Sequence, residues 1–310
     1  MIENAVNSAS VTFAGEGNTL CIGGIMGHAY SASSRTSSVK NCVNYGTVTH
    51  AGRCGCVSIG GIIGFLKGDS EYEDSKRRLL NNANYGSIVV TGIATGKTYA
   101  GGIAGEIFRF SNTTSCLSWG KIDIEPTENT IIGGITGPVT ESNNIISYCV
   151  WTPNTGAVNG TGELYGNMTV TEVSLLDLNE TALETLNSGA EKNGLSKWVI
   201  VHLLGGRVEG IATEKLILIW ELLPTPTKEG HDFDGYWTDT QQTTKYDPET
   251  TSTTGITDVY ASWVVKSYML TFDFGNGTVG SKTFNYSEVI DYPSATREGH
   301  TFDGWEPKLE

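Results

Sequence analysis

In the first half of the chain, apolar residues flank a recurring pair of glycines. The pairs stand at 23/24, 60/61, 101/102 and 133/134, at spacings of 37, 41 and 32 residues. Self-similarity at such a period is the sequence signature of stacked repeats. The apolar residues form two columns, Ile22, Ile59, Ala100 and Ile132 before the pairs and Ile25, Ile62, Ile103 and Ile135 after them.

The two columns are three residues apart, which on a straight strand would put them on opposite faces. A helix would bring them together, but each glycine disfavours a helix by about 1 kcal/mol. Glycine tolerates positive φ and close backbone approach, so a bend at the pair can turn both columns toward one interior. We therefore predict a right-handed β-solenoid of about four repeats, in which the column after the glycines is buried and stacked.

A second motif, Asn-Tyr-Gly, precedes the glycine pair by about fifteen residues. By the same reasoning its apolar residues face the interior: Val43, Tyr45 and Val48 around Gly46, and Ala83, Tyr85 and Ile88 around Gly86. The asparagines Asn44 and Asn84 form a polar ladder between coils or simply cap turns. The insert at 66–78 is expected to be a loop, and its charge run indicates a solvated segment more than a binding site.

All six cysteines lie in this half of the chain: Cys21, Cys42, Cys54, Cys56, Cys116 and Cys149. Cys42, Cys116 and Cys149 share a repeat column that also holds Ala5 and Asn82, so we expect buried free thiols there. A disulfide framework stays open, because the number of cysteines is even. Cys54 and Cys56 are too close for a relaxed mutual bridge, and the absence of a second Cys or His pair argues against a zinc site.

The series N-x-x-NYG-x-V followed by GGI-x-G, over about residues 2–160, resembles the GLUG-motif repeats of large bacterial surface and secreted proteins. That family includes extracellular peptidases and adhesins. The last copy departs from the pattern, because YCVWTPNTGAVNG keeps Cys149 and an aromatic residue but has no Asn-Tyr-Gly. The resemblance implies an extracellular protein.

A short helix is predicted after the repeats, over 179–188. Asn179 is a good N-cap and Gly189 a stop signal, and the apolar side carries Leu178, Leu183 and Leu186. We expect this helix to cover the last coil, because a bare terminal coil exposes apolar core and unpaired strand edges.

A second repeat begins near residue 197. The stretch PTPTKEGHDFDGYW (224–237) recurs 69 residues later as PSATREGHTFDGW (293–305). With F-D-x-x-x-G at 272–277 and Y-A-S-W at 260–263, this half resembles the internalin B-repeat, or Listeria-Bacteroides repeat, family over about 197–310. The resemblance implies small β-grasp-like modules, repeated as beads in the stalks of cell-surface proteins.

The two copies of this repeat differ in ways that matter for stability and packing. The second copy has no Y-A-x-W stretch, so we expect it to be truncated and less stable than the first. Gly235-Tyr236-Trp237 stands where the second copy has Gly304-Trp305, which leaves the register of the aromatic residue open. Five of the seven tryptophans lie in this half, and we expect them to be core residues in preference to a sugar-stacking platform.

Charge and hydropathy exclude several classes of partner. The chain carries 34 Asp and Glu against 20 Lys and Arg, a formal charge of −14. Such a surface repels phosphate backbones and anionic lipids, so we expect no nucleic-acid partner. There is no run of 18 apolar residues and no signal-peptide pattern, so we expect no direct membrane insertion in this segment, with the anchor and signal peptide lying outside it.

Catalytic patterns do not stand out. None of the five histidines has metalloprotease spacing, and no G-x-S-x-G, Walker loop or dinucleotide fingerprint occurs in a strand–helix context. The repeat columns hold Gly, Ile, Asn, Tyr and Cys, whereas a β-helix lyase would group Asp, Lys or Arg on one strand face. We predict no enzyme, no catalytic, cofactor-binding or metal-binding residues, and no cofactor.

These observations predict a mainly β chain with four parts: a GLUG-like solenoid (1–170), a capping helix and linker (171–196), a B-repeat-like module (197–266) and a second, truncated module (267–310). The leading hypothesis is a non-enzymatic segment of an extracellular cell-surface protein, serving adhesion or acting as a stalk or spacer. As an adhesin, it would bind surface glycans or proteins of a host or neighbouring cell. The alternative is an accessory or carbohydrate-binding region of a secreted enzyme whose catalytic domain lies elsewhere.

Overall fold

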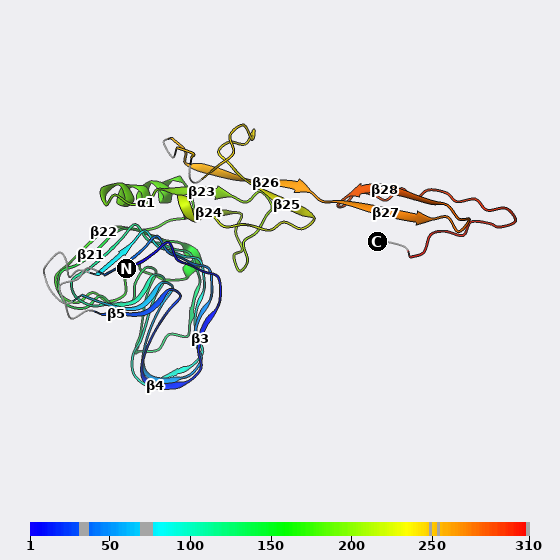
Figure 1. Cartoon of the computed structure of the whole chain (residues 1–310). Coiled ribbons are helices and arrows are strands. Elements are labelled where there is room, and N and C mark those ends of the chain that lie inside the picture. Colours follow the sequence, from blue (N-terminus) through cyan, green and yellow to red (C-terminus); the bar gives the residue numbers. More distant parts are fainter. Residues whose placement is uncertain (31–36, 69–76, 248–249, 253–254, 308–310) are drawn as a thin grey trace.

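The structure is a computed structural model that describes residues 1–30, 37–68, 77–247, 250–252 and 255–307. It is mainly β: a solenoid of about four coils is followed by one α-helix and by small β-sheet modules (Figure 1). This confirms the predicted fold class. The solenoid contains four sheets of parallel strands, here called sheets A to D.

The strands of each solenoid sheet come from successive coils. Sheet A contains β1 (Ile2–Glu3), β2 (Val6–Asn7), β6 (Ser37–Lys40), β7 (Val43–Asn44), β11 (Arg77–Leu80), β12 (Ala83–Asn84), β17 (Ser111–Thr114), β18 (Leu117–Ser118), β21 (Asn144–Trp151) and β22 (Met168–Leu175). Sheet B contains β3 (Val11–Phe13), β8 (Val48–His50), β13 (Ile88–Val90) and β19 (Ile122–Ile124). Sheet C contains β4 (Glu16–Gly23), β9 (Arg53–Gly60), β14 (Ile93–Ala94), β15 (Thr98–Gly101) and β20 (Thr130–Gly133). Sheet D contains β5 (Met26–Tyr30), β10 (Ile63–Lys67) and β16 (Ala104–Ile107).

Each coil has two arms, and each arm has its own core. Sheets A and D enclose one apolar cluster, and sheets B and C enclose the other (Figure 1). The isoleucines after the glycine pairs stack through backbone hydrogen bonds, from Ile25 N to Ile62 O (3.1 Å), from Ile62 N to Ile103 O (3.0 Å) and from Ile103 N to Ile135 O (2.7 Å). Ile62, Ile103 and Ile135 are fully buried, as predicted. Ile25 is only half-buried, because it belongs to the first coil and has a neighbour on one side.

The glycine pairs recur at the same place in each coil because the backbones of neighbouring coils approach closely there. The φ angles of these glycines are not positive. A Cβ on Gly60 would lie 2.1 Å from the carbonyl oxygen of Ile63, and a Cβ on Gly61 would lie 2.1 Å from Cγ of Asn84. The left-handed corner of each coil falls instead on another column, at Asn4, Asn41, Asn81, Ser115 and Tyr148, with φ between 51° and 59°. Asparagine tolerates this conformation better than most residues, which explains the first Asn of the N-x-x-NYG motif.

The second asparagine of that motif both caps a turn and forms a ladder. Asn44 Nδ2 donates to the carbonyl oxygen of Gly46 (2.8 Å) and to Oδ1 of Asn84 (2.8 Å). Asn7 Nδ2 donates in turn to Oδ1 of Asn44 (2.7 Å). Both alternatives left open by the sequence are therefore realised. In the first two coils, the second glycine of the pair faces this asparagine. The Asn-Tyr-Gly motif and the glycine pair therefore pack against each other.

The column containing Cys42, Cys116 and Cys149 is fully buried, and all three thiols are free. Burial raises the pKa of the Cys42 and Cys149 thiols, so both stay protonated near neutral pH. Cys21, Cys54 and Cys56 are free as well, and Cys56 is exposed. All six thiols are thus unpaired in the structure, as predicted for Cys42, Cys116 and Cys149.

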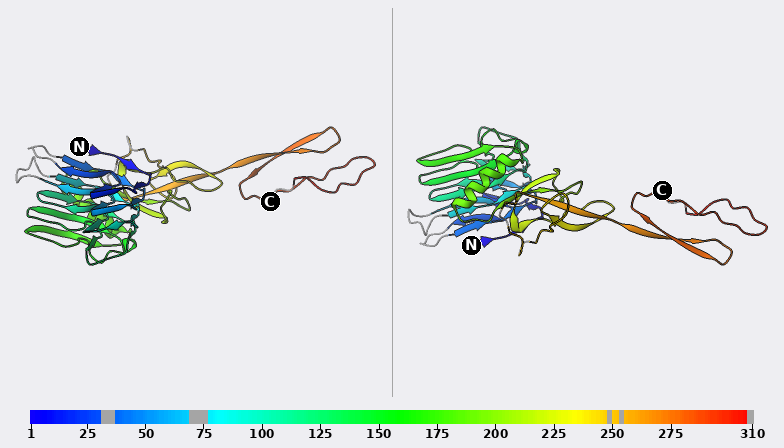
Figure 2. Two further views of the ribbon diagram at one scale, coloured as in Figure 1. Left: turned by 90° about the horizontal axis from the view of Figure 1, so that it is seen from below. Right: turned by 90° about the horizontal axis from the view of Figure 1, so that it is seen from above.

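The helix α1 (Glu180–Lys192) begins as predicted, with Asn179 Oδ1 accepting a hydrogen bond from the Ala182 amide (3.1 Å). It does not stop at Gly189, which is buried and packs so tightly that a Cβ there would lie 2.5 Å from Cβ of Tyr148. The helix lies along the side of the coils and not over the end of the stack (Figure 2). The expected end cap is therefore wrong, and among the described strands the last one, β22, pairs with β21.

The first module after the helix is a four-stranded sheet in the order β24–β23–β26–β25. Its strands are β23 (Trp198–His202), β24 (Lys215–Ile219), β25 (His231–Trp237) and β26 (Asp258–Val265). The second module contains a two-stranded hairpin of β27 (Ser267–Asp273) and β28 (Val279–Asn285), which projects away from the solenoid (Figures 1 and 2). Two short 3₁₀ helices, η2 (Pro153–Thr155) and η3 (Trp220–Leu222), complete the secondary structure of the described residues.

Candidate functional site

The candidate site is the contact between the solenoid and the first module, here called the joint. Three aromatic side chains from successive coils stack here, Tyr45 on Tyr85 and Tyr85 on Trp119, each with ring centroids 5.9 Å apart. Tyr45 and Tyr85 share one apolar cluster with Val43, Ala83 and strands β23 and β24. These four residues therefore face the module, and the prediction that they face the solenoid interior is wrong.

The sequence spacing explains this outward direction. Val43 and Tyr45 are two residues apart, so they share a face, while Asn44 between them points toward the glycine pair. Val48 and Ile88, beyond the turn at the glycine of the motif, do lie in the solenoid interior as predicted.

Tyr85 joins the solenoid to the backbone of the module. Its hydroxyl donates to the carbonyl oxygen of Ile217 (2.9 Å) and accepts from the amide of the same residue (2.8 Å). Ile217 lies on β24, an edge strand of the module sheet, so a side chain of the solenoid pairs with this sheet edge. Burial raises the pKa of Tyr85 well above its usual value, which keeps this hydroxyl protonated and able to donate.

A second polar contact uses the left-handed corner column. Trp198 Nε1 donates to Oδ1 of Asn81 (2.5 Å) and to Oγ of Ser115 (3.0 Å). Asn81 Nδ2 donates to the carbonyl oxygen of Ser196 (2.9 Å), and Ser115 Oγ lies 2.8 Å from the carbonyl oxygen of Leu186 on α1. Trp198 is fully buried, so the module, the helix and the coils share one hydrogen-bonded, solvent-free contact.

The seven tryptophans are all at least half-buried. Trp151, Trp198 and Trp220 are buried, and the other four are half-buried. Trp305 donates from Nε1 to the carbonyl oxygen of Pro293 (2.7 Å), as the hydroxyl of Tyr236 does to that of Pro224 (3.1 Å). This pairing settles the register that the sequence left open, because Tyr236 and Trp305 take the same place in their modules.

An aromatic and cationic cluster covers the outer face of sheet D. His28 and Tyr30 are exposed, and Phe65 contacts His28 with ring centroids 4.9 Å apart. Lys67 Nζ lies 5.0 Å from the ring centroid of Tyr30 and 5.0 Å from that of Phe108. The neighbouring insert predicted as a loop lies mostly outside the described residues, at 69–76.

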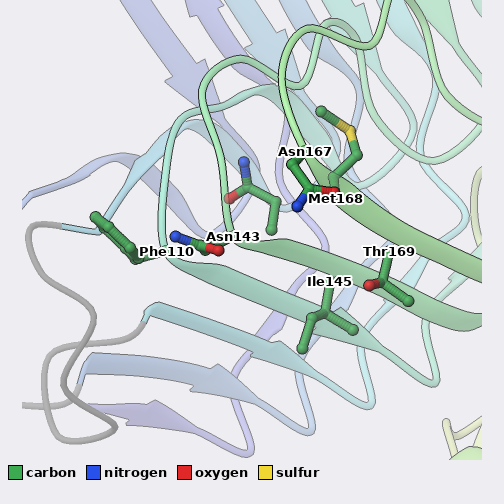
Figure 3. A pocket seen from close by; sticks show the side chains of 7 residues that line it. Phe110, Asn143, Ile145, Asn167, Met168 and Thr169 are labelled. Carbon is green, nitrogen blue, oxygen red and sulfur yellow. The ribbon is translucent and has the colours of Figure 1, made fainter.

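A hollow of about 330 Å³ lies where the turns at Phe110, Asn143 and Asn167 stack, at the tip of the arm formed by sheets A and D (Figure 3). Its lining is aromatic, aliphatic and amide in character, and includes Met168 and Thr169. Without a titratable side chain in its lining, this hollow offers no general acid or base.

Among the titratable side chains that the structure describes, His202 Nε2 lies 2.8 Å from Asp258 Oδ1. Within the described ranges, no three His, Cys, Asp or Glu side chains are placed to hold a metal ion. Glu106 is half-buried, accepts a hydrogen bond from Ser58 Oγ (3.1 Å), and has a pKa raised by burial. No helix of the described chain is long and apolar enough to cross a membrane.

A β-solenoid joined to small β-sheet modules defines this chain as a repeat protein. Residues 209–262 and 268–308 match the Listeria-Bacteroides repeat domain, so the C-terminal part carries this repeat twice. The resemblance of residues 2–160 to GLUG repeats stays a prediction.

Curated relatives are similar to about a third of this chain. Internalin H of Listeria monocytogenes is 36% identical over 104 residues, which are 32% of this chain and 19% of internalin H. Two proteins of Evansella cellulosilytica, named "Putative Gly-rich membrane protein" and "Putative membrane protein", are 32% and 33% identical over 103 residues, which cover 12% and 15% of their lengths. The chain thus matches less than a fifth of each of these relatives, and none of their names describes a catalytic domain. No solved structure is significantly similar to this chain.

Proposed function

We propose that this chain is a non-enzymatic segment of an extracellular cell-surface protein and that it acts as a rigid spacer. The joint at Tyr85 and Trp198 carries this proposal, because it replaces a flexible connection by a buried contact. Two bodies that share an apolar cluster and paired backbone groups cannot rotate freely against each other. The relatives named as an internalin and as membrane proteins support a cell-surface location.

The spacer function is tested by measuring how far the segment holds an epitope above a membrane. The segment is placed between a membrane anchor and a terminal epitope on a cell, and the height of the epitope above the membrane is measured by fluorescence interference. We expect a single, defined height, and a lower, broader distribution when the joint is opened by replacing Tyr85 and Trp198 with alanine. Equal distributions for both forms would contradict the rigid-spacer function.

Adhesion is the second candidate, and the cluster on the outer face of sheet D favours it. Exposed aromatic rings beside an ammonium group can stack on sugar rings and pair with an anionic substituent. The purified chain is tested on a glycan array and on intact cells, beside a variant with Phe65→Ala and Lys67→Ala and a control with Val289→Ala, an exposed residue far along the second module. Binding that only the Phe65/Lys67 variant loses supports adhesion, and binding to nothing leaves the spacer function.

An accessory region of a secreted enzyme is the remaining alternative. The chain matches 12% of one relative and 19% of another, so most of their length lies outside the matched region and can hold other domains. The same glycan array addresses our non-enzymatic assignment, because turnover of any glycan by the purified chain would overturn it.

A further inference from the structure

The hollow of about 330 Å³ at the tip of the arm formed by sheets A and D combines an aromatic ring, apolar side chains and amide groups (Figure 3). Its size falls at the lower end of the range of about 300 to 1,000 Å³ found for small-molecule sites. The turns that form it stack in register, because the Phe110 amide donates to the carbonyl oxygen of Ser142 (3.4 Å) and the Asn143 amide to that of Asn167 (2.8 Å). These backbone groups are used within the stack, so the hollow offers side chains to a ligand.

Three asparagines line the hollow, and two of them have unused amide groups. Asn144 is buried and structural, because its Oδ1 accepts from the Ser111 amide (3.1 Å) and its Nδ2 donates to the carbonyl oxygen of Thr140 (3.1 Å). Asn143 and Asn167 are exposed, and their side-chain amides have no hydrogen-bond partner within the described part of the chain. An amide group presents a donor and an acceptor in one plane. The two exposed amides can therefore pair with groups that both donate and accept, such as neighbouring hydroxyls.

Phe110 has a backbone conformation that does not suit a large side chain. The register of β17 and β21 makes Asn143 its equivalent in the next coil, and φ is 53° at Phe110 and 65° at Asn143. Asparagine tolerates this left-handed conformation, whereas a bulky residue is strained in it. Strain of this kind is typical of ligand-binding sites, where the side chain is needed in spite of its cost. The Phe110 ring is half-buried and lines the hollow together with Ile145 and Met168.

The charge of the site favours a neutral ligand. None of the described residues that line the hollow is acidic or basic. The chain as a whole has a formal charge of −14, which repels anionic polymers. Neighbouring strands lie about 4.8 Å apart, so the turns of Phe110, Asn143 and Asn167 span about 10 Å. Two linked sugar rings can cover this length, and each has an apolar face and a rim of hydroxyls.

We propose that the hollow binds a neutral oligosaccharide. The Phe110 ring stacks on the apolar face of one sugar ring, and the amides of Asn143 and Asn167 pair with hydroxyls. Without a titratable side chain in its lining, the site holds the sugar and does not cleave it. This site goes beyond the spacer function and is separate from the cluster on the outer face of sheet D.

The test screens the purified full chain on an array of neutral gluco-, manno- and galacto-oligosaccharides. Uronic-acid and sulfated glycans are included for comparison, because Arg109 Cζ lies 6.0 Å from the ring centroid of Phe110. The neutral oligosaccharide that binds most tightly is then titrated into the ¹⁵N-labelled chain. We expect the side-chain amide signals of Asn143 and Asn167 to shift, and that of Asn44, which is buried in the asparagine ladder, to stay unchanged.

Two variants remove the binding groups without disturbing the turns, because glycine adopts a left-handed φ freely. Phe110→Gly should weaken binding about two- to tenfold through the loss of the stacked ring, with no fall in the melting temperature. Asn143→Gly should weaken binding about two- to tenfold through the loss of one hydrogen-bonding group. Leu204→Gly is the matched control, since Leu204 of the first module has φ of 49° and is exposed, and this change should leave binding unaltered.

Three outcomes would overturn the proposal. They are the absence of binding to every neutral glycan, a preference for the anionic glycans, and unchanged binding by both Phe110→Gly and Asn143→Gly. The third outcome would place the sugar elsewhere on the chain. Because the spacer function is tested by the height of an epitope, failure of glycan binding leaves that function standing.

Discussion

Replacing Tyr85 by phenylalanine removes a single oxygen atom from the joint. The hydroxyl is the partner of both the amide and the carbonyl of Ile217, at 2.8 and 2.9 Å. Both groups are buried, and an unpaired buried backbone group costs about 1 to 3 kcal/mol. The change should therefore lower the free energy of unfolding of the joint by about 2 to 6 kcal/mol, while the ring still fills its place in the aromatic stack.

Tyr45 provides a matched control on the same column. Its ring stacks on that of Tyr85, but its own buried hydroxyl has no hydrogen-bond partner within the described residues. Tyr45→Phe removes an unpaired polar atom and should leave stability unchanged or slightly raised. Urea unfolding of both variants gives the free energies, and hydrogen exchange at the amide of Ile217 reports the local effect. Equal losses in the two variants, or unchanged protection of Ile217 in Tyr85→Phe, would refute the role assigned to this hydroxyl.

Further predictions concern the packing and titration of the coils. Gly61→Ala should destabilise the solenoid by about 3 kcal/mol or more in urea unfolding, because the added Cβ would lie 2.1 Å from Cγ of Asn84, whereas Gly17→Ala, with open space around it, should be neutral. His50 is fully buried with both ring nitrogens unpaired within the described chain, and burial lowers its pKa. Since the folded state favours neutral His50, stability should fall as the pH drops below about 6.5, and His50→Val should reduce this acid sensitivity in melting temperatures measured against pH. Thiol titration without reductant should detect Cys56 readily in the native chain and all six thiols after unfolding, and fewer than six would point to disulfides.

The repeat period, the stacked isoleucines and the free thiols could be predicted because each depends on neighbouring coils that the sequence displays in register. The direction of Tyr85 could not, because its partner, Ile217, lies 132 residues away and no local pattern marks that contact. A signal was nonetheless present, since Val43 and Tyr45 share a face that excludes the asparagine between them. The alternation in the Asn-Tyr-Gly motif indicates two faces, one packed within the coils and the other packed against a further element.

For the glycine pairs, the sequence predicted the position correctly but explained it only in part. The sequence locates them, but the contact between Gly61 and Asn84 comes from the next coil, so only the stack explains why a side chain is excluded. The helix shows the opposite case. Its N-cap is local and was predictable, whereas its continuation past Gly189 depends on a close approach to Tyr148 that a helix considered alone does not contain.

The central claim is that the solenoid and the first module form one rigid body through the joint. The distance between spin labels on Cys56 of the solenoid and on a Val264→Cys variant of β26 tests it directly, because both sites are exposed and lie on strands. A Cys21→Ala background removes the half-buried thiol, and the four buried thiols stay unlabelled. A rigid joint predicts one narrow distance distribution in pulsed electron resonance, and a broad distribution in the otherwise unchanged chain would contradict it.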